Sequence, residues 1–389
     1  MRRLSSLAIV PAAFVLVAAD ELKPSDYAAD ARSIEAIVNA QYAYLDRFPG
    51  GRMPMTDKLR AEAGAVSTPR ELVRYSERAL ALLADHHAIT GSSTKESWAV
   101  VPSYADLWVE RKGPDYVIEQ VRADTPASQA GIKAGDRLVS IGGVPTATAV
   151  SAFWADLGAA GGGDRDGYAA RVLVAGRRDR QRELVVQTGS AAPRALSLPN
   201  LYYRDLLDRP ALTGNEVGSD FVIRIHDSLG NSATIAAFDR VMERAKPGQR
   251  VVIDLTDTPG GGNTTVARAM LGWFVDKPTF YQMHRLPAEE RETGIARQWV
   301  EQVLPRPGKR HRGPVTVRVG RWTGSMGEGL AIGFDAIGAR VEGSRMAGLL
   351  GAIYDHRLER SGQVIKIPTE RLYAVDGTPR EHFVPKHGR

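Results

Sequence analysis

A strand, a helix and a second strand follow one another over residues 221–255, and this order restricts the fold more than any other feature of the sequence. A β-rich run at residues 221–225 precedes apolar residues at helical spacing over residues 235–242. Residues 250–255 then form a continuous apolar strand of the kind that is buried on both faces of a sheet. Such a unit joins parallel strands by a right-handed crossover. We therefore expect a β/α domain in the C-terminal part of the chain.

Three consecutive glycines, Gly260, Gly261 and Gly262, come after the second strand and before a helix that starts near Asn263. Glycine lets backbone N–H groups approach an anion closely. A phosphate loop is disfavoured, because no Gly-Lys-Ser/Thr follows and the dinucleotide spacing is missing. The pattern favours an oxyanion site, and a turn without a function is the alternative.

Ser325 stands where a predicted strand at residues 315–319 gives way to a predicted helix that includes residues 330–334. At such a junction the side chain projects from a tight turn. The free N–H groups and the positive end of the helix dipole can then stabilise an oxyanion beside it. Ser325 is therefore the candidate nucleophile. The alternative is that it serves only as an N-cap, a position that serine favours.

The composition limits the other possibilities. The chain has 389 residues, enough for about two or three domains, and its lack of cysteine excludes disulfides, thiolate metal sites and a cysteine nucleophile. A net charge of +6 is too modest for a nucleic-acid footprint, and the histidines are not arranged at metal-ligand spacing. We expect no cofactor, no metal and no nucleic-acid partner, whereas an oligomer is compatible with the sequence.

Residues 1–19 have the pattern of a secretory signal peptide. Arg2 and Arg3 precede a short apolar stretch, and small residues come before Asp20. An uncleaved N-terminal anchor is the alternative, and no later run approaches the roughly 20 apolar residues that a bilayer requires. We expect a periplasmic or secreted protein without a stable membrane span after removal of the signal.

A helical region is expected over residues 20–103. Its second helix is well marked, because Thr68 can act as an N-cap with Pro69 at the first helical position. This helix leads to the adjacent histidines His86 and His87. They could be cations at the helix C-terminus, or one could be a base that the following loop presents.

Residues 104–190 are expected to form a separate β module. Thr125 caps a single turn, Gly131 ends that turn, and residues 137–141 form an alternating strand that ends at two glycines. Further strands are predicted at residues 171–174 and 183–186. Residues 130–136, Ala-Gly-Ile-Lys-Ala-Gly-Asp, resemble a PDZ domain, which implies binding of extended peptides at a sheet edge. The glycine pattern of a carboxylate-binding loop is missing before residues 106–110.

Residues 279–312 are expected to be an insertion with an amphipathic helix near residues 288–303.

Together with this module, the glycine turn after Asp254, the turn from Ser325 to Glu328 and the tail at residues 380–385 resemble the tail-specific or C-terminal processing serine proteases. The resemblance covers residues 68–385 and points to the tricorn-core-like branch. It implies an α+β multidomain fold: an N-terminal helical segment, a PDZ-like β domain and, over residues 191–389, a crotonase-like or Clp-like β/α protease core.

The resemblance also implies roles for individual residues. Ser325 matches the nucleophile, His87 the base of an Asp-x-His motif, and Glu381 the acid that orients the base. Gly260, Gly261 and the N–H of Met326 would form the oxyanion hole. Leu349 stands at the position of the lysine that bacterial processing proteases use as the base, so activity would require imidazole.

The sequence therefore predicts an exported serine endopeptidase that cleaves extended or unfolded polypeptides through an acyl-enzyme on Ser325. A catalytically inactive scaffold of the same fold is the main alternative, because Leu349, Thr256 and Thr258 depart from the family pattern. A PDZ-led adaptor is a third possibility. His86 or His226 could replace His87 as the base, and Glu381 could be a surface carboxylate.

Overall fold

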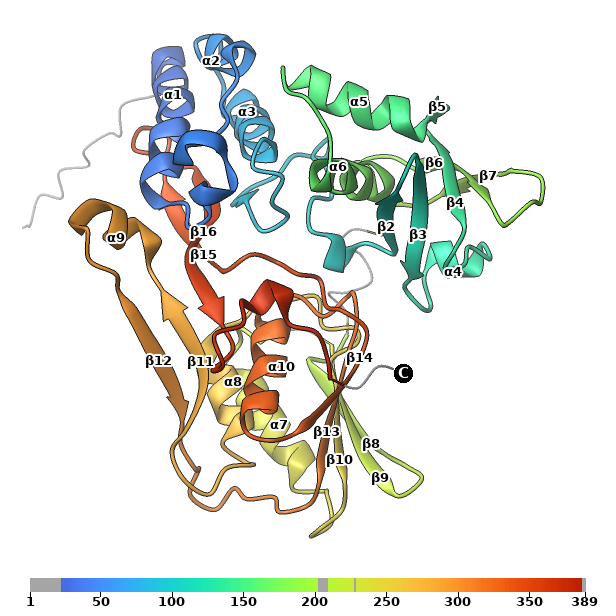
Figure 1. Ribbon diagram of the computed structural model, residues 1–389, viewed down its shortest axis with the longest axis vertical. Coiled ribbons are helices and arrows are strands. Elements are labelled where there is room, and N and C mark those ends of the chain that lie inside the picture. The colour runs from blue at the N-terminus through green and yellow to red at the C-terminus, as the bar shows by residue number, and fades with distance from the viewer. Residues whose placement is uncertain (1–21, 202–208, 227–228, 387–389) are drawn as a thin grey trace, which may run out of the picture.

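The structure is a computed structural model that describes residues 22–201, 209–226 and 229–386 (Figure 1). The predicted signal peptide, residues 1–19, lies outside the described residues. Three parts follow one another along the chain: N-terminal helices, a first β module and a C-terminal region with two further sheets. The predicted α+β architecture is confirmed.

The N-terminal part consists of three α-helices that share one apolar core. They are α1 (Pro24–Gln41), α2 (Asp57–Ala63) and α3 (Pro69–Ala81), and short 3-10 turns lie at Leu45–Arg47, Pro49–Gly51 and Pro102–Tyr104. The start of α3 follows the predicted chemistry, since the Thr68 side chain accepts a hydrogen bond from the N–H of Glu71. The helix ends at Ala81, so the two histidines lie on the loop that leads to β1 (Ile89–Thr90).

The second part is a β sheet with helices against it. Its strands are β2 (Leu107–Lys112), β3 (Asp115–Val121), β4 (Arg137–Ile141), β5 (Val144–Pro145), β6 (Arg182–Gln187) and β7 (Arg194–Leu198), in the order β2-β3-β4-β6-β7 with β5 on β4. The helices are α4 (Pro126–Gln129), α5 (Thr146–Asp156) and α6 (Asp164–Ala175). Thr125 caps α4 as expected, and Gly131 follows the turn with a φ of 70°.

The strand predicted at residues 171–174 is instead part of helix α6, which lies beside β2 (Figure 1). Tyr168, Ala169 and Val172 are buried at helical spacing, so the apolar run that suggested a strand is the inner face of a helix. The sheet also continues through β7, beyond residue 190, where we had placed the domain boundary.

The third part contains a mostly parallel sheet. Its order is β14 (Arg340–Gly343), β13 (Val315–Val319), β10 (Val251–Asp254), β9 (Asp220–Ile225) and β8 (Leu212–Val217), and only β8 is antiparallel to its neighbour. Helices α7 (Ala233–Met242), α8 (Thr264–Leu271) and α10 (Met326–Ala336) accompany it. The predicted strand, helix and strand are β9, α7 and β10, and they pair in parallel as expected.

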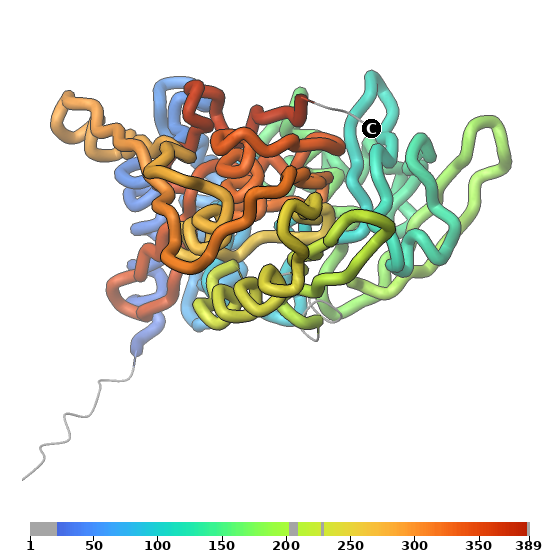
Figure 2. The backbone as a smooth tube through the Cα atoms, turned by 90° about the horizontal axis from the view of Figure 1, so that it is seen from below, coloured from blue at the N-terminus to red at the C-terminus, as the bar shows by residue number. Residues whose placement is uncertain are grey.

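An antiparallel sheet joins the C-terminal part to the N-terminal helices. It contains β1, β16 (Val364–Tyr373), β11 (Thr279–Arg285) and β12 (Gln298–Val303), with β15 (Ala352–Arg357) also paired to β16. Its last strand contacts α1, and Figure 2 shows the red C-terminal segments against the blue N-terminal ones. Because β1 pairs with β16, the loop between α3 and β1 lies against the C-terminal region.

The prediction of a long amphipathic helix at residues 288–303 is wrong. Helix α9 covers only Pro287–Thr293 and ends at Gly294, whose φ of 74° is left-handed. The second half of the segment is strand β12, which pairs with β11. Two-residue alternation at Trp299, Glu301 and Val303 therefore outweighs the helical reading.

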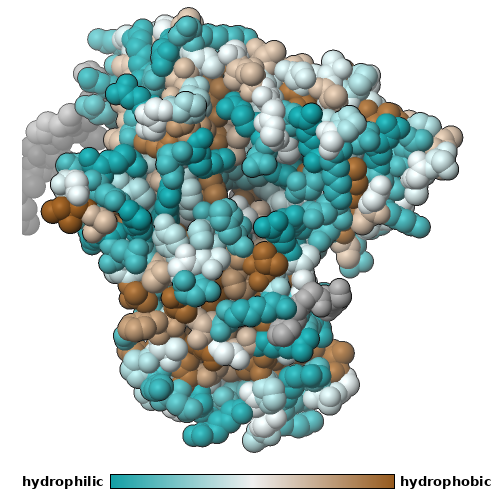
Figure 3. All heavy atoms as spheres, in the orientation of Figure 1, coloured by the Kyte–Doolittle hydropathy of each residue, from teal (hydrophilic) through white to brown (hydrophobic). Residues whose placement is uncertain are grey.

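The surface is mixed. On the face shown in Figure 3, hydrophobic side chains lie in small groups among hydrophilic ones, and a hollow opens between the upper and lower parts. Within the described residues, no helix is both long enough and apolar enough to cross a membrane.

Candidate active site

Ser325 lies on a sharp turn between β13 and α10, as the sequence predicted. Its backbone has a φ of 50°, a left-handed conformation that costs a non-glycine residue about 1–3 kcal/mol. The preceding glycine makes this turn possible, because a Cβ on Gly324 would lie 2.4 Å from the carbonyl oxygen of Pro259. The Ser325 N–H donates to Glu328 Oε2 at 2.8 Å, which holds the strained residue in place.

The glycine turn lies directly against Ser325. Gly260 has a φ of 137°, and a Cβ there would be 3.0 Å from the Cβ of Ser325. Among the described residues, the backbone N–H groups of Gly260, Gly261 and Met326 donate to no protein acceptor. Met326 is also the first residue of α10, where the helix dipole favours negative charge. The glycine turn and the first residue of α10 therefore lie next to Ser325.

His87 reaches Ser325 from the other end of the chain. Its Nε2 lies 3.1 Å from Ser325 Oγ, and its Nδ1 lies 2.7 Å from the carbonyl oxygen of Leu350. A carbonyl oxygen can only accept a hydrogen bond, so Nδ1 carries the proton and Nε2 offers its lone pair to the serine. Burial, aided by the positive charge of Arg380, lowers the pKa of His87 to about 4. The ring is therefore neutral at pH 7 and can accept a proton.

Asp85 fixes the loop that carries His87. Its Oδ1 accepts the N–H of His87 at 2.8 Å, and its Oδ2 accepts the hydroxyl of Tyr42 at 2.8 Å. Arg47 in turn donates to the Tyr42 hydroxyl at 3.0 Å. Burial raises the pKa of Asp85 to about 6. The aspartate of the Asp-x-His motif therefore positions the main chain of the histidine rather than its ring.

Glu381 does not contact His87 in the manner that we expected. It lies in the 3-10 turn Arg380–His382, and its Oε2 is buried without a hydrogen-bond partner among the described residues. The ring nitrogen that the acid would have held, Nδ1, instead donates to Leu350. No sequence pattern marks a main-chain carbonyl for this role, so sequence reasoning had no means of finding it.

Leu349, at the position of the family's lysine, is buried. It packs in an apolar cluster with Val101, Trp108 and Ala347. The other candidate bases are engaged elsewhere: His86 contacts the Val100 carbonyl and Arg171, and His226 Nε2 lies 3.3 Å from Thr213 Oγ1.

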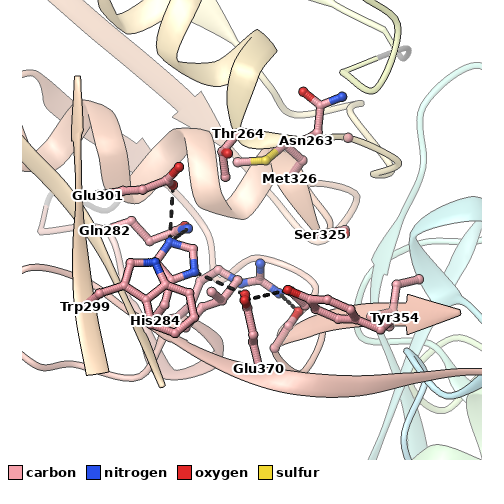
Figure 4. Close-up of a pocket in the computed structure, with 16 residues that line it drawn as sticks. Asn263, Thr264, Gln282, His284, Trp299, Glu301, Ser325, Met326, Tyr354 and Glu370 are labelled. Atoms are coloured by element: carbon pink, nitrogen blue, oxygen red, sulfur yellow. Dashed lines mark hydrogen bonds and ion pairs between the residues drawn. The ribbon is translucent and has the colours of Figure 1, made fainter. Parts of the chain in front are cut away.

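A cavity of about 380 Å³ opens beside Ser325 (Figure 4). Its far wall contains Gln282, His284, Trp299, Glu301, Tyr354 and Glu370. His284 lies between two carboxylates, 3.1 Å from Glu370 and 3.2 Å from Glu301. Burial opposes the charge of His284, but the two carboxylates raise its pKa to about 9. Sequence reasoning missed this network, because its members come from three separate strands.

No group of three or more histidine, aspartate or glutamate side chains among the described residues could hold a metal ion. The described residues offer a hydroxyl within hydrogen-bonding distance of a neutral imidazole, next to the glycine turn. Such a set can carry out acyl transfer by nucleophilic catalysis.

The fold is that of a peptidase with an attached PDZ domain. The model of peptidase family S41 matches residues 222–385, and that of the PDZ domain matches residues 117–153. These two matches agree with the resemblance of the chain to the tail-specific proteases, with a peptidase S41 domain as its C-terminal part.

Two solved structures share this fold over nearly the whole chain. The photosystem II D1 C-terminal processing protease is 18% identical, with a TM-score of 0.56, over 94% of this chain and 93% of that chain. Mature CPAF is 13% identical, with a TM-score of 0.59, over 94% of this chain and 92% of that chain. A search of curated proteins found no match.

Proposed function

We propose that the protein is an exported serine endopeptidase that cleaves extended or unfolded polypeptides through an acyl-enzyme on Ser325. The observation that carries this proposal is the 3.1 Å contact between His87 Nε2 and Ser325 Oγ. This contact pairs a hydroxyl that can act as a nucleophile with a ring nitrogen that can accept its proton.

The proposed reaction follows from the hydrogen bonds. His87 Nε2 takes the proton of the Ser325 hydroxyl while Oγ bonds to the carbonyl carbon of the substrate. The carbonyl oxygen becomes an oxyanion that the N–H groups of Gly260, Gly261 and Met326 stabilise. His87 then gives its proton to the leaving amine nitrogen as the peptide C–N bond breaks. In the second half, His87 Nε2 takes a proton from a water molecule, whose oxygen bonds to the acyl carbon. His87 then gives this proton to Oγ as the ester C–O bond breaks, which releases the carboxylic acid product and restores the Ser325 hydroxyl.

Two parts of the structure support a polypeptide substrate. The cavity beside Ser325 can receive a side chain of the residue before the cleaved bond, and its wall combines Trp299 with the polar network of His284. The PDZ domain belongs to a class that binds extended peptides at a sheet edge. The export of the protein is supported by the signal pattern at residues 1–19, and sequencing the N-terminus of the mature protein would test cleavage before Asp20.

A fluorophosphonate probe tests the proposal directly, because it reacts with an activated serine and requires no knowledge of the substrate. The expected result is labelling of Ser325 in the folded wild-type protein, together with hydrolysis of unfolded casein. Absence of both in folded protein would favour the inactive scaffold. Tight peptide binding without hydrolysis would favour the PDZ-led adaptor.

A further inference from the structure

We propose that Arg380 is a positioning residue: together with Glu328 it fixes the strap, residues 347–351, so that the Leu350 carbonyl holds the His87 ring against Ser325. This inference rests on the proposed function, because it assigns the orientation of the base in that same site. It gives the main chain of the strap a role in orienting the base, whereas the side chain of Leu349 is apolar and cannot act as a base.

Glu328 fixes one side of the strap. Its carboxylate accepts the N–H of Gly348 at 2.8 Å and the N–H of Leu349 at 3.2 Å. The same carboxylate accepts the N–H of Ser325. Glu328 is fully buried, and burial raises its pKa to about 7, while Arg380 and these backbone donors act in the opposite direction. One carboxylate therefore ties the nucleophile and the strap to each other.

Arg380 fixes the other side. Its Nη2 donates to the carbonyl oxygens of Leu349 and Gly351, each at 2.8 Å. The same nitrogen lies 4.0 Å from Glu328 Oε2, and only 3% of Arg380 is exposed. The carbonyls on both sides of Leu350 are thereby held, and the Leu350 carbonyl between them accepts from His87. A buried arginine with this geometry orients the acceptor of the ring.

Arg380 has two effects that can be separated. It holds the strap by hydrogen bonds, and its positive charge contributes to the lowered pKa of His87, after burial. A lysine would keep the charge, but its shorter side chain ends before the position of Nη2 and lacks the planar fork of arginine. A methionine would remove both the charge and the hydrogen bonds. Comparison of the two substitutions therefore separates the effect of the hydrogen bonds on the strap from the effect of the positive charge on the pKa of His87.

The test compares Arg380→Lys and Arg380→Met by the rate of fluorophosphonate labelling and by kcat and KM on casein-derived peptides across pH. Misplacement of a catalytic group by about 1 Å can cost roughly 10²-fold, so both variants should lose about that factor in kcat with little change in KM. The acid limb of the pH profile should move to higher pH only in Arg380→Met, because removal of the positive charge lets His87 bind a proton more easily.

Arg306→Lys is the matched control. Arg306 also makes a paired contact to a carboxylate, Asp239, at 2.6 Å and donates to the Ala269 carbonyl. The Arg306→Lys variant should keep the wild-type kcat. The inference is overturned if the wild-type protein is labelled and the folded Arg380→Lys variant keeps the wild-type kcat. That result would leave the proposed function intact. Absence of labelling in the wild type would instead remove the proposed function.

A measurement on the wild type covers the case in which the Arg380 variants do not fold. Nitrogen-15 NMR of His87 should show a proton on Nδ1 and none on Nε2 at neutral pH. A proton on Nε2 would mean that the Leu350 carbonyl does not hold the ring, which would overturn the inference.

Discussion

The imidazole of His87 and the hydroxyl of Ser325 meet at 3.1 Å although 238 positions separate the two residues in the chain. The histidine comes from a loop after α3, and the serine immediately precedes α10, in a different part of the fold. A hydroxyl and an imidazole from distant parts of the chain thus lie within hydrogen-bonding distance of each other.

Ser325→Ala and His87→Gln should each reduce hydrolysis by roughly 10⁴-fold or more, because each removes a member of a unit that acts together. The measurement is kcat on a casein-derived peptide, with circular dichroism to show that each variant is folded. His86→Gln is the matched control, since His86 is a half-buried neighbour that contacts Val100 and Arg171 rather than the serine. Equal losses in the two histidine variants would contradict the assignment of the base.

Glu381→Gln should reduce kcat by less than about tenfold, because the His87 ring donates to a main-chain carbonyl and not to this carboxylate. In a serine hydrolase whose acid orients the ring, the same change costs about 10⁴-fold. Kinetics of the purified variant distinguish the two cases. A loss near the larger value would show that Glu381 takes over the ring during turnover, as the family resemblance implied.

Activity should persist to unusually low pH. A histidine with its ordinary pKa, about 6.5, would be half protonated near that pH, whereas the pKa of His87 is lowered to about 4. The base form is present above the folded-state pKa, so the rate of labelling should fall only as the pH drops through about 4. A fall centred near pH 7 would instead mean either that His87 keeps its ordinary pKa or that Glu328, whose pKa is raised to about 7, is the titrating group.

Gly260→Ala should lower kcat by about 10²-fold or more, the usual effect of losing an oxyanion donor. The new Cβ would lie 3.0 Å from the Cβ of Ser325, so the turn and the serine would have to move apart. Gly189→Ala is the control, because Gly189 also has a positive φ, 53°, but has no atom within 4 Å of the new Cβ. Comparable losses of kcat in the two variants would mean that backbone strain, not the oxyanion hole, explains the effect.

His284 should make the free energy of unfolding decrease as the pH rises into the alkaline range. Its folded-state pKa is raised to about 9, so its contribution to the free energy of unfolding is complete below the unfolded pKa and is lost as the pH rises through about 9. Urea unfolding at pH 6 and at pH 9.5 measures the decrease. The decrease should be smaller in His284→Gln, and an equal decrease there would assign the effect to other groups.

Much of this molecule could be predicted from local sequence. The capped start of α3, the turn of α4 and the strand-to-helix position of Ser325 follow from residue chemistry within a few positions. The parallel pairing of β9 and β10 follows from a rule of handedness and adjacency. The failures came where one apolar run fits two periods, as in α6 and β12.

The site could be predicted only in part, because its orientation depends on contacts that have no sequence pattern. The nearness of His87 to Ser325 could be expected only through a family resemblance, and no spacing in the sequence requires it. The Leu350 carbonyl and the hydrogen bonds of Arg380 depend on the path of the main chain. Such groups become visible only in three dimensions.

The burial of Leu349 explains why a lysine does not fit this position of the fold. A lysine here would place an ammonium group in the apolar cluster of Val101 and Trp108, away from the water that a charge requires. The single substitution Leu349→Lys would therefore destabilise the protein, and an amine base at this position would require polar substitutions among its neighbours as well.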